Sequence, residues 1–210
     1  TATNTYNTAV GYVAGLSITT GKQNTLIGGL AGDAKTTGFN DVAVGYQALS
    51  SDTKGQNSVA IGYQALTAQN FTTATNAYNV AVGRSAGAAI TTGIRNNLFG
   101  AESGEALTDA DDNIAIGYQA LTADTLGSRS VAIGNNALDA QNFTTATNTY
   151  NVAVGYAAGG AVSTGVYNTL IGGLAGDSLT VASENTVLGY ASLTADDVGS
   201  QNTAVGAYAL

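Results

Sequence analysis

The stretch NSVAIGYQAL, residues 57–66, decides the fold, because variants of it recur along the whole chain. In each variant a glycine follows a large apolar residue. These glycines are spaced by 17, 17, 17 and then 21 positions, so that four units make a super-repeat with a period of 72 positions. A fixed period of this kind is the signature of a repeat architecture. The twelve unit glycines, called ladder glycines below, are Gly11, Gly28, Gly45, Gly62, Gly83, Gly100, Gly117, Gly134, Gly155, Gly172, Gly189 and Gly206.

Two long identities support the larger period. AQNFTTATN at 68–76 recurs at 140–148, one super-repeat further on, and TLIGGLAGD at 25–33 recurs at 169–177, two super-repeats further on. The opening TATN at 1–4 also matches the TATN at 73–76. We therefore interpret residues 1–210 as a single repeat array, a window of a longer fibre, with a partial super-repeat at 1–66 and super-repeats at 67–138 and 139–210.

Three positions around the ladder glycine vary little between units. The residue just before it is large and apolar in all twelve units, and the residue three after it is Ala in ten. The residue four before it is Asn in nine units, with Asp41, Ser58 and Ser130 in the other three. The nine asparagines are Asn7, Asn24, Asn79, Asn96, Asn113, Asn151, Asn168, Asn185 and Asn202.

The β-branched stretch ahead of each ladder glycine, about five residues long, is followed by a segment rich in Gly, Ser, Thr and Asp, which is typical of a short strand and a turn. A unit of this length is too short for a strand–helix–strand crossover. We therefore predict an all-β fold, a parallel β-solenoid or β-roll, in which each of the twelve units is one coil. The lack of Pro agrees with this fold, because Pro cannot donate the ladder hydrogen bonds of stacked coils.

Stacking places equivalent residues in columns, and each column carries a prediction. The large apolar residues just before the ladder glycines should form a continuous buried stripe, and the asparagines a ladder of hydrogen-bonded amides. Most charged residues fall in the connecting segments, which we expect to be wet. The column of small residues at Ala14, Ala31, Ala48 and Ala65 offers a surface that another chain can approach closely, and so predicts self-association.

Composition excludes several classes of function. The chain has 14 acidic and 6 basic residues, a net charge of −8, and neither His nor Cys. Without imidazole and thiolate groups, most zinc, haem and iron–sulfur sites and the Ser-His and Cys-His nucleophile pairs are unavailable. The negative charge disfavours nucleic acid as a partner, and no apolar run approaches the roughly 18 residues of a membrane span. We expect no cofactor, no nucleic-acid partner and no membrane span in this window.

The motifs resemble two groups of fibre proteins. NSVAIG at 57–62, NIAIG at 113–117 and SVAIG at 130–134 are similar to the signature of the head repeats of trimeric autotransporter adhesins, which are left-handed parallel β-rolls that trimerise. NTAVG at 7–11 and 202–206, and GYQAL at 45–49, 62–66 and 117–121, resemble repeats of phage tail-fibre and bacterial surface proteins. The resemblance covers all twelve units and implies a homotrimeric fibre. The units here are longer than the head repeat, and Tyr commonly follows the glycine.

Aromatic residues are the candidate surface contacts. A column of exposed tyrosines after the ladder glycines can stack on the sugar rings of a glycan, whereas the alternative that we favour is that they stack on one another. The phenylalanines of the longer units would protrude every fourth unit, although burial of each against its own coil is the role that we favour. These residues are Tyr12, Tyr46, Tyr63, Phe71, Tyr118, Phe143, Tyr156 and Tyr190.

Three further motifs have an ordinary explanation beside a functional one. The DADD run at 109–112 has the chemistry of a Ca²⁺ site, but charge runs are more often solvated loops. Asn70-Phe71-Thr72 and Asn142-Phe143-Thr144 fit the glycosylation sequon, although such triplets arise by chance in a chain rich in Asn and Thr. The adjacent carboxylates Asp196 and Asp197 are the only suggestion of a glycosidase pair, and nothing marks them as more than surface charge.

We predict a non-enzymatic fibre protein that is structural and adhesive: a stiff extracellular, cell-surface or virion filament that presents contacts to a host, a receptor or a neighbouring fibre. The expected partners are the chain itself, as a homotrimer, and a surface glycan or receptor. A glycan-processing enzyme on a β-solenoid scaffold is one alternative, and it would require a unique carboxylate pair in a groove. A glycan-binding module is the other alternative, and a glycan array would distinguish it.

Overall fold

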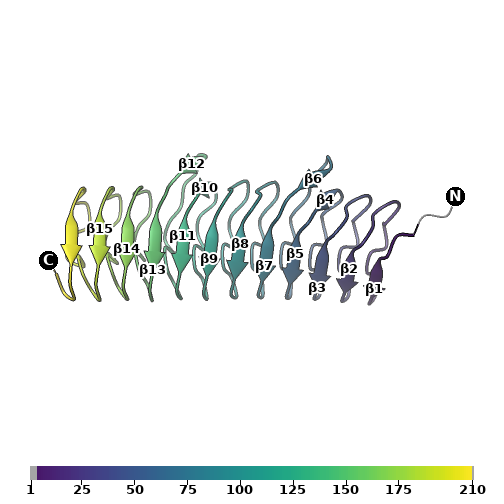
Figure 1. Cartoon of the computed structure of the whole chain (residues 1–210), viewed down its shortest axis with the longest axis horizontal. Coiled ribbons are helices and arrows are strands. Elements are labelled where there is room, and N and C mark those ends of the chain that lie inside the picture. The colour runs from purple at the N-terminus through teal and green to yellow at the C-terminus, as the bar shows by residue number, and fades with distance from the viewer. Residues whose placement is uncertain (1–3, 210) are drawn as a thin grey trace.

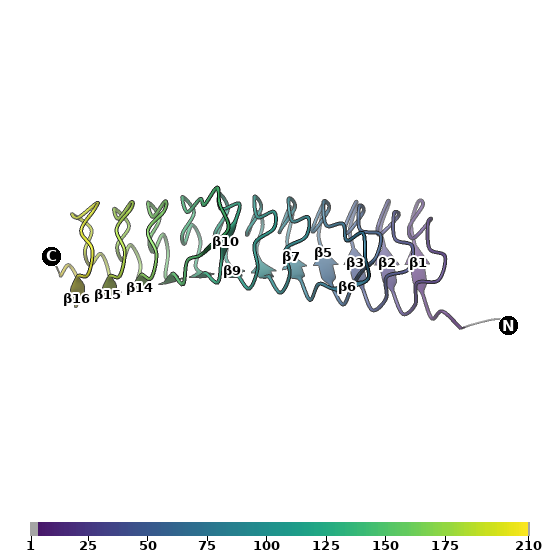
Figure 2. The ribbon, with the colours of Figure 1, turned by 90° about the horizontal axis from the view of Figure 1, so that it is seen from above.

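The computed structural model describes residues 4–209, which form sixteen short strands and no helix. Twelve strands of three residues each make one parallel sheet, in which each strand is bonded to the equivalent strands of the neighbouring coils. Figure 1 shows these strands side by side and pointing the same way along a straight rod, and Figure 2 shows from above that the coils follow a single axis. The predicted all-β parallel β-solenoid of twelve coils is therefore confirmed.

Each strand of the large sheet ends at the residue before a ladder glycine, and the register joins equivalent residues of successive units, as in Ala9 with Leu26 and Ala60 with Ala81. Equivalent residues consequently form straight columns. The strands are β1 (Thr8–Val10), β2 (Thr25–Ile27), β3 (Val42–Val44), β5 (Val59–Ile61), β7 (Val80–Val82), β8 (Asn97–Phe99), β9 (Ile114–Ile116), β11 (Val131–Ile133), β13 (Val152–Val154), β14 (Thr169–Ile171), β15 (Thr186–Leu188) and β16 (Thr203–Val205).

The ladder glycine ends each strand in a conformation that other residues rarely adopt. Gly45 has a φ of +136°, and a Cβ at this position would overlap the carbonyl oxygen of Gly62 in the next coil. The two backbones can lie this close because neither residue has a side chain. The glycine column therefore permits both the turn out of the strand and the tight stacking of coils.

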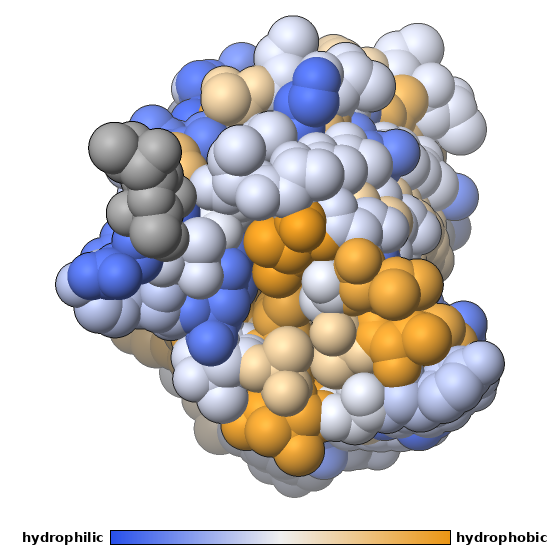
Figure 3. Space-filling view, turned by 90° about the vertical axis from the view of Figure 1, so that its right-hand side faces the viewer, coloured by the Kyte–Doolittle hydropathy of each residue, from blue (hydrophilic) through white to orange (hydrophobic). Residues whose placement is uncertain are grey.

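The core is the narrow interior of the coil. The middle residue of each strand points inward and is Ala, Leu or Val, as at Ala43, Leu98 and Val187, each inaccessible to solvent. Figure 3 views the rod from the end that carries β1 and shows apolar residues gathered over the interior of the first coil. The column three residues after the ladder glycine also points inward, so the predicted surface of small residues is wrong: Ala31 and Ala48 are fully buried. After the ladder glycine the chain turns back over the interior of the coil. The space at this position accommodates only a side chain as small as the methyl group of Ala.

Two types of coil, which follow one another in pairs, differ in how they fill the rest of this interior. The residue four after the ladder glycine is Leu49 in one type, and the residue seven after the glycine is then the polar Asp52. In the other type these two positions are Gly87 and Ile90. A Cβ on Gly87 would lie 2.7 Å from Leu98 Cδ1 and 3.0 Å from Ile90 Cδ1, so aliphatic side chains already occupy that space. The two positions therefore compensate for each other in volume.

The predicted burial of the Val and Ile column is wrong. The last residue of each strand is exposed or half-exposed, for example Ile61 at 37%, Phe99 at 42% and Val205 at 64%. Successive side chains of a strand point to opposite faces. Because the asparagine four before the glycine and the middle strand residue both face inward, the first and last strand residues must face outward.

The expectation that the connecting segments are wet is also wrong at particular charged residues. Lys35, Asp52 and Asp124 lie in these segments and are fully buried. Their side chains occupy the interior position seven after a ladder glycine, which the backbone directs inward whatever residue stands there. Burial of these charges requires polar partners, which are described below.

Each of the two long coils pairs with the coil before it in an additional small sheet. β4 (Gly55–Gln56) pairs with β6 (Thr75–Asn76), and β10 (Gly127–Ser128) pairs with β12 (Thr147–Asn148), both parallel. These segments project from the rod in Figure 1. Phe71 and Phe143 are only 6% and 7% exposed, so these two candidate surface contacts are wrong, and both side chains are buried, which is the role that we favoured. No helix in residues 4–209 is long and apolar enough to cross a bilayer.

Candidate functional site: the outer stripe

The outer stripe is the outward face of the large sheet, formed by the first and last residues of its twelve strands. The last residue is Val, Ile, Phe or Leu in every coil, and none of these strand residues is charged. Exposures include 39% for Ile116, 38% for Ile171 and 48% for Leu188. An apolar surface that continues along the whole rod exceeds the scattered apolar residues of an ordinary protein surface and marks an interaction site.

The asparagine column holds the strands of the stripe from inside. Asn168 is fully buried; its Nδ2 donates to the carbonyl of Ala182 at 2.8 Å, and its Oδ1 accepts the backbone N–H of Asn185 at 3.0 Å. Each such amide therefore joins one coil to the next beside the strand. The same bond to the next backbone N–H links Asn7 to Asn24, Asn79 to Asn96, Asn96 to Asn113, Asn151 to Asn168, and Asn185 to Asn202.

Exposed side chains border the stripe on both sides. After the ladder glycines, the rings of Tyr46 and Tyr63 stack with centroids 5.8 Å apart. Before the asparagines, the rings of Tyr150 and Tyr167 stack at 5.7 Å. Stacking leaves the tyrosines open to solvent, and glycan contact stays a prediction. The predicted column is exposed throughout, from 46% to 79%, and consists of Tyr12, Tyr46, Tyr63, Tyr118, Tyr156 and Tyr190.

The border column five positions before the ladder glycine was not predicted from the sequence. All of its members have a left-handed backbone, for example Tyr167 at φ 60° and Arg95 at φ 59°. The signal that could have revealed it is that no residue in this column is β-branched, since β-branched residues disfavour a positive φ. The left-handed residue turns the chain so that the next residue, the buried asparagine, points into the coil.

Three charged residues of this border lie on consecutive coils in the middle of the rod. Arg95 Nε donates to Asp112 Oδ1 at 2.5 Å, Arg129 Nε lies 3.9 Å from Asp112 Oδ2, and Arg129 Nη1 donates to the hydroxyl of Tyr150 at 2.9 Å. The hydrogen bond from Arg95 lowers the pKa of Asp112. Two carboxylates of the 109–112 run, Asp111 and Asp112, thus lie beside arginines, whereas Asp109 accepts the hydroxyl of Thr92. Residues 4–209 contain no group of three or more acidic side chains arranged around a metal position.

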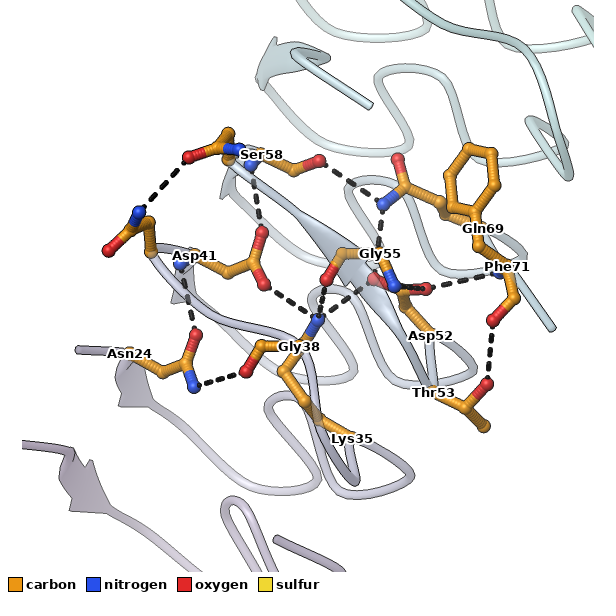
Figure 4. Close-up of polar contacts among 12 residues, drawn as sticks. Asn24, Lys35, Gly38, Asp41, Asp52, Thr53, Gly55, Ser58, Gln69 and Phe71 are labelled. Carbon is orange, nitrogen blue, oxygen red and sulfur yellow. Dashed lines mark hydrogen bonds and ion pairs between the residues drawn. The ribbon is translucent and has the colours of Figure 1, made fainter. Parts of the chain in front are cut away.

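A buried ion cluster lies inside the coils that carry β3 and β4 (Figure 4). Lys35 Nζ donates to Asp41 Oδ2 at 2.7 Å, to Asp52 Oδ2 at 2.9 Å and to the carbonyl of Gly55 at 2.9 Å. Asp52 also accepts the backbone N–H groups of Gly55 and Phe71. Two carboxylates thus share one ammonium group without access to water, and burial raises the pKa of Asp41 to about 6.

In the other two super-repeats the equivalent interior site has no lysine. Leu107 and Asn113 stand one super-repeat after Lys35 and Asp41. The remaining carboxylate, Asp124, accepts Gln141 Nε2 at 2.6 Å and the N–H groups of Gly127 and Phe143 at 3.0 Å. Lys35 and Asp41 therefore replace Leu and Asn as a pair. The replacement of Leu and Asn by Lys35 and Asp41 together was the sequence signal from which the buried cluster could have been found. The cluster has a structural role, because Asp52 binds the backbone of Phe71 and so attaches the long coil.

The carboxylates considered for catalysis lie on a turn. Asp196 Oδ1 accepts the backbone N–H of Gly199 at 2.7 Å and that of Val198 at 3.2 Å. Its Oδ2 accepts Asn202 Nδ2 at 3.2 Å. Asp196 thus occupies the place of Asp52 and Asp124 in the third super-repeat, and the surface of residues 4–209 has no pocket.

Some of the coils that form the outer stripe and the asparagine column match a known protein family. Residues 37–65, 54–75 and 114–137 match the YadA head domain repeat. They contain β3, β5, β9 and β11, and they cover well under half of the chain. No curated protein and no solved structure matches the chain. The head repeat is a structural module of surface adhesins, so the match indicates an adhesin-like surface fibre.

Proposed function

We propose that the chain is a section of a stiff homotrimeric filament at a cell or virion surface, in which the outer stripes of three parallel chains pack against one another. The observation that carries the proposal is the exposed, uncharged apolar stripe along a chain whose net charge is −8. Chains of like charge repel one another, so association requires a contact surface that carries no charge and whose burial outweighs this repulsion. The trimeric nature of YadA-type adhesins supports three as the number of chains.

The period of the stripe favours another copy of the same chain as the occupant. Side chains along the stripe repeat once per coil, at about the 4.8 Å spacing of paired strands. A second stripe of the same length has the same spacing of side chains and offers apolar surface along all twelve coils. A parallel, threefold arrangement buries the stripe of every chain equivalently, as closed symmetry requires.

Light-scattering mass tests this assembly. We expect a mass of three chains for the unmodified protein and for Thr144→Asp, which adds a charge on an exposed loop of a long coil. Ile116→Asp adds the same charge within the stripe and should give a smaller mass, because burying an unpaired carboxylate is costly. Far-ultraviolet circular dichroism would show that both variants remain folded. A single-chain mass for the unmodified protein would refute the homotrimer.

The contacts that such a filament presents are a separate proposal. We assign them to the tyrosine column after the ladder glycines, because Tyr46 and Tyr63 are half-exposed yet stacked, which provides a rigid aromatic edge for a glycan or receptor. Binding of the intact protein to a glycan array, lost in Tyr46→Ala with Tyr63→Ala and kept in Thr144→Ala, would support this role. A binding profile that the tyrosine variant leaves unchanged would exclude these residues.

The boundaries of the super-repeats, at 66 and 138, remain a prediction. The proposed location, outside the cell or on a virion, rests on the surface exposure of YadA-type adhesins. The proposed homotrimer and the proposed tyrosine contacts do not depend on each other.

Mechanically, each added coil lengthens the rod by the same amount, and its ladder hydrogen bonds resist unfolding.

A further inference from the structure

A regular stripe cannot by itself determine how three chains align. If one chain slips along its neighbours by one coil, the last residue of each strand still meets Val or Ile from another coil, and most apolar contacts are retained. Register is weakly specified wherever the repeating surface is uniform. A filament built from such stripes therefore needs at least one coil that differs from the others.

Among the seven coils from β3 to β13, whose other strands all begin with Val or Ile, one coil differs, and it contains β8. Asn97 is the only amide among the first residues of the twelve strands, and Phe99 is the only aromatic among the last residues. Asn97 lies at the centre of a run of seven coils, with three β-branched aliphatic residues on each side. These six residues are Val42, Val59, Val80, Ile114, Val131 and Val152.

The Asn97 side chain points outward from the sheet and is half-buried between its neighbours in the column. It hydrogen-bonds to no other side chain or backbone group among residues 4–209, whereas the neighbouring Asn96 is fully buried and donates to the carbonyl of Ala110 at 2.7 Å. The Asn97 amide thus has a free donor and a free acceptor on the surface that the proposed homotrimer covers.

We propose that Asn97, supported by Phe99, sets the register of the three chains. This inference rests on the proposed homotrimer. Only when the chains are aligned coil for coil do three Asn97 side chains reach the same height, where each can donate to one neighbour and accept from the other. Any slip of one to three coils places the amide against Val or Ile and leaves it buried without a partner, which is unfavourable. A single polar residue fixes alignment in this way within coiled coils.

The chain has no Cys, so introduced cysteines can report the alignment. One reporter chain carries Val44→Cys and keeps Asn97. The other carries Val82→Cys, two coils further along, together with Asn97→Val and Val131→Asn, which move the amide by the same two coils. In register, the two cysteines lie about 9.6 Å apart along the rod, beyond the roughly 7 Å limit for a disulfide. A slip that matches the two amides brings the cysteines to the same height.

The two chains are unfolded together, refolded and mildly oxidised. Mass spectrometry then counts the disulfides that join position 44 of the first chain to position 82 of the second. We expect at least tenfold more of these disulfides than in a control mixture in which the second chain carries Val82→Cys alone. Equal amounts in the two mixtures, with a three-chain mass in both, would overturn the register inference and leave the homotrimer intact. A single-chain mass in both mixtures would overturn the homotrimer and the inference with it.

Discussion

Gly172 and Gly173 are neighbours in the chain, yet a side chain would meet different surroundings at each. Gly172 has a φ of +133°, and a Cβ there would overlap the carbonyl oxygen of Gly189. A Cβ on Gly173 would lie 3.5 Å from the ring of Tyr190, which is ordinary contact. The difference arises because only Gly172 lies at the point where successive coils approach backbone to backbone.

Gly172→Ala should therefore lower the free energy of unfolding by about 2–4 kcal/mol, since it adds a strained conformation to a steric overlap. Gly173→Ala should change it by less than about 0.5 kcal/mol. Urea denaturation followed by circular dichroism would measure both values. Similar losses in the two variants would show that the ladder glycine is not required for backbone approach.

At Lys35, the side chain is needed only because two carboxylates face it. Lys35→Leu should cost about 3–5 kcal/mol, because it leaves Asp41 and Asp52 buried without a cation. Adding Asp41→Asn should restore most of that loss, because Leu107 and Asn113 already form this combination in the next super-repeat. Urea denaturation of the single and double variants tests this pairing. A double variant no more stable than Lys35→Leu would contradict it.

The same cluster makes stability depend on pH. The pKa of Asp41 is about 6 in the folded protein, against an ordinary value of 3.8, so the folded chain binds this proton more tightly than the unfolded chain does. The resulting stabilisation is fully present below pH 3.8 and is lost as the pH rises through about 6. Between pH 4 and 7 the unmodified protein should lose on the order of 2 kcal/mol more than the variant with Lys35→Leu and Asp41→Asn, as urea denaturation at each pH would measure. Burial also raises the pKa of Asp124, but that residue is common to both proteins.

At the scale of the coil, the strand is shorter than its sequence pattern indicated. The pattern of about five residues yields three strand residues, because the asparagine ahead of the strand uses its amide and the glycine behind it turns. The sequence placed a strand ahead of each ladder glycine, but it did not show which of the strand residues point inward. Val and Ile are usually expected to be buried. Here the buried middle residue of the strand is Ala in most coils, because the interior of those coils is too narrow for a larger side chain.

Removal of one amide from the asparagine ladder should weaken the contact between two coils. Asn168→Ala leaves the carbonyl of Ala182 and the backbone N–H of Asn185 without their buried partner. We expect a loss of about 2–3 kcal/mol in the free energy of unfolding. Asn148→Ala, at an exposed asparagine of β12, is the matched control and should cost less than about 0.5 kcal/mol. Thermal and urea unfolding of both variants would decide whether the ladder amides carry the stacking.

At the scale of the whole molecule, the rod should accept the loss of a coil but not of part of one. Deletion of residues 156–172 joins Gly155 to Gly173 and keeps every remaining column in place. This variant should unfold in a single transition at a somewhat lower temperature, because stability in a stacked array is a sum over repeats and their interfaces. Deletion of residues 156–164 removes about half a coil and displaces every later column. Circular dichroism should show loss of β structure only in the second variant, and equal behaviour of the two would exclude column-by-column stacking.

The order and number of the coils, their parallel stacking and the asparagine column followed from the sequence by itself, because a strict period forces equivalent residues into the same surroundings. Which columns face inward was decided only by the tertiary structure. Composition could not distinguish a buried Val from one on an outward face, since each strand has apolar residues on both faces. The positions of Lys35, Asp52 and Phe71 likewise depended on where the connecting backbone turns, and the positive-φ residues after the ladder glycines, such as Leu49, were not identified from the sequence.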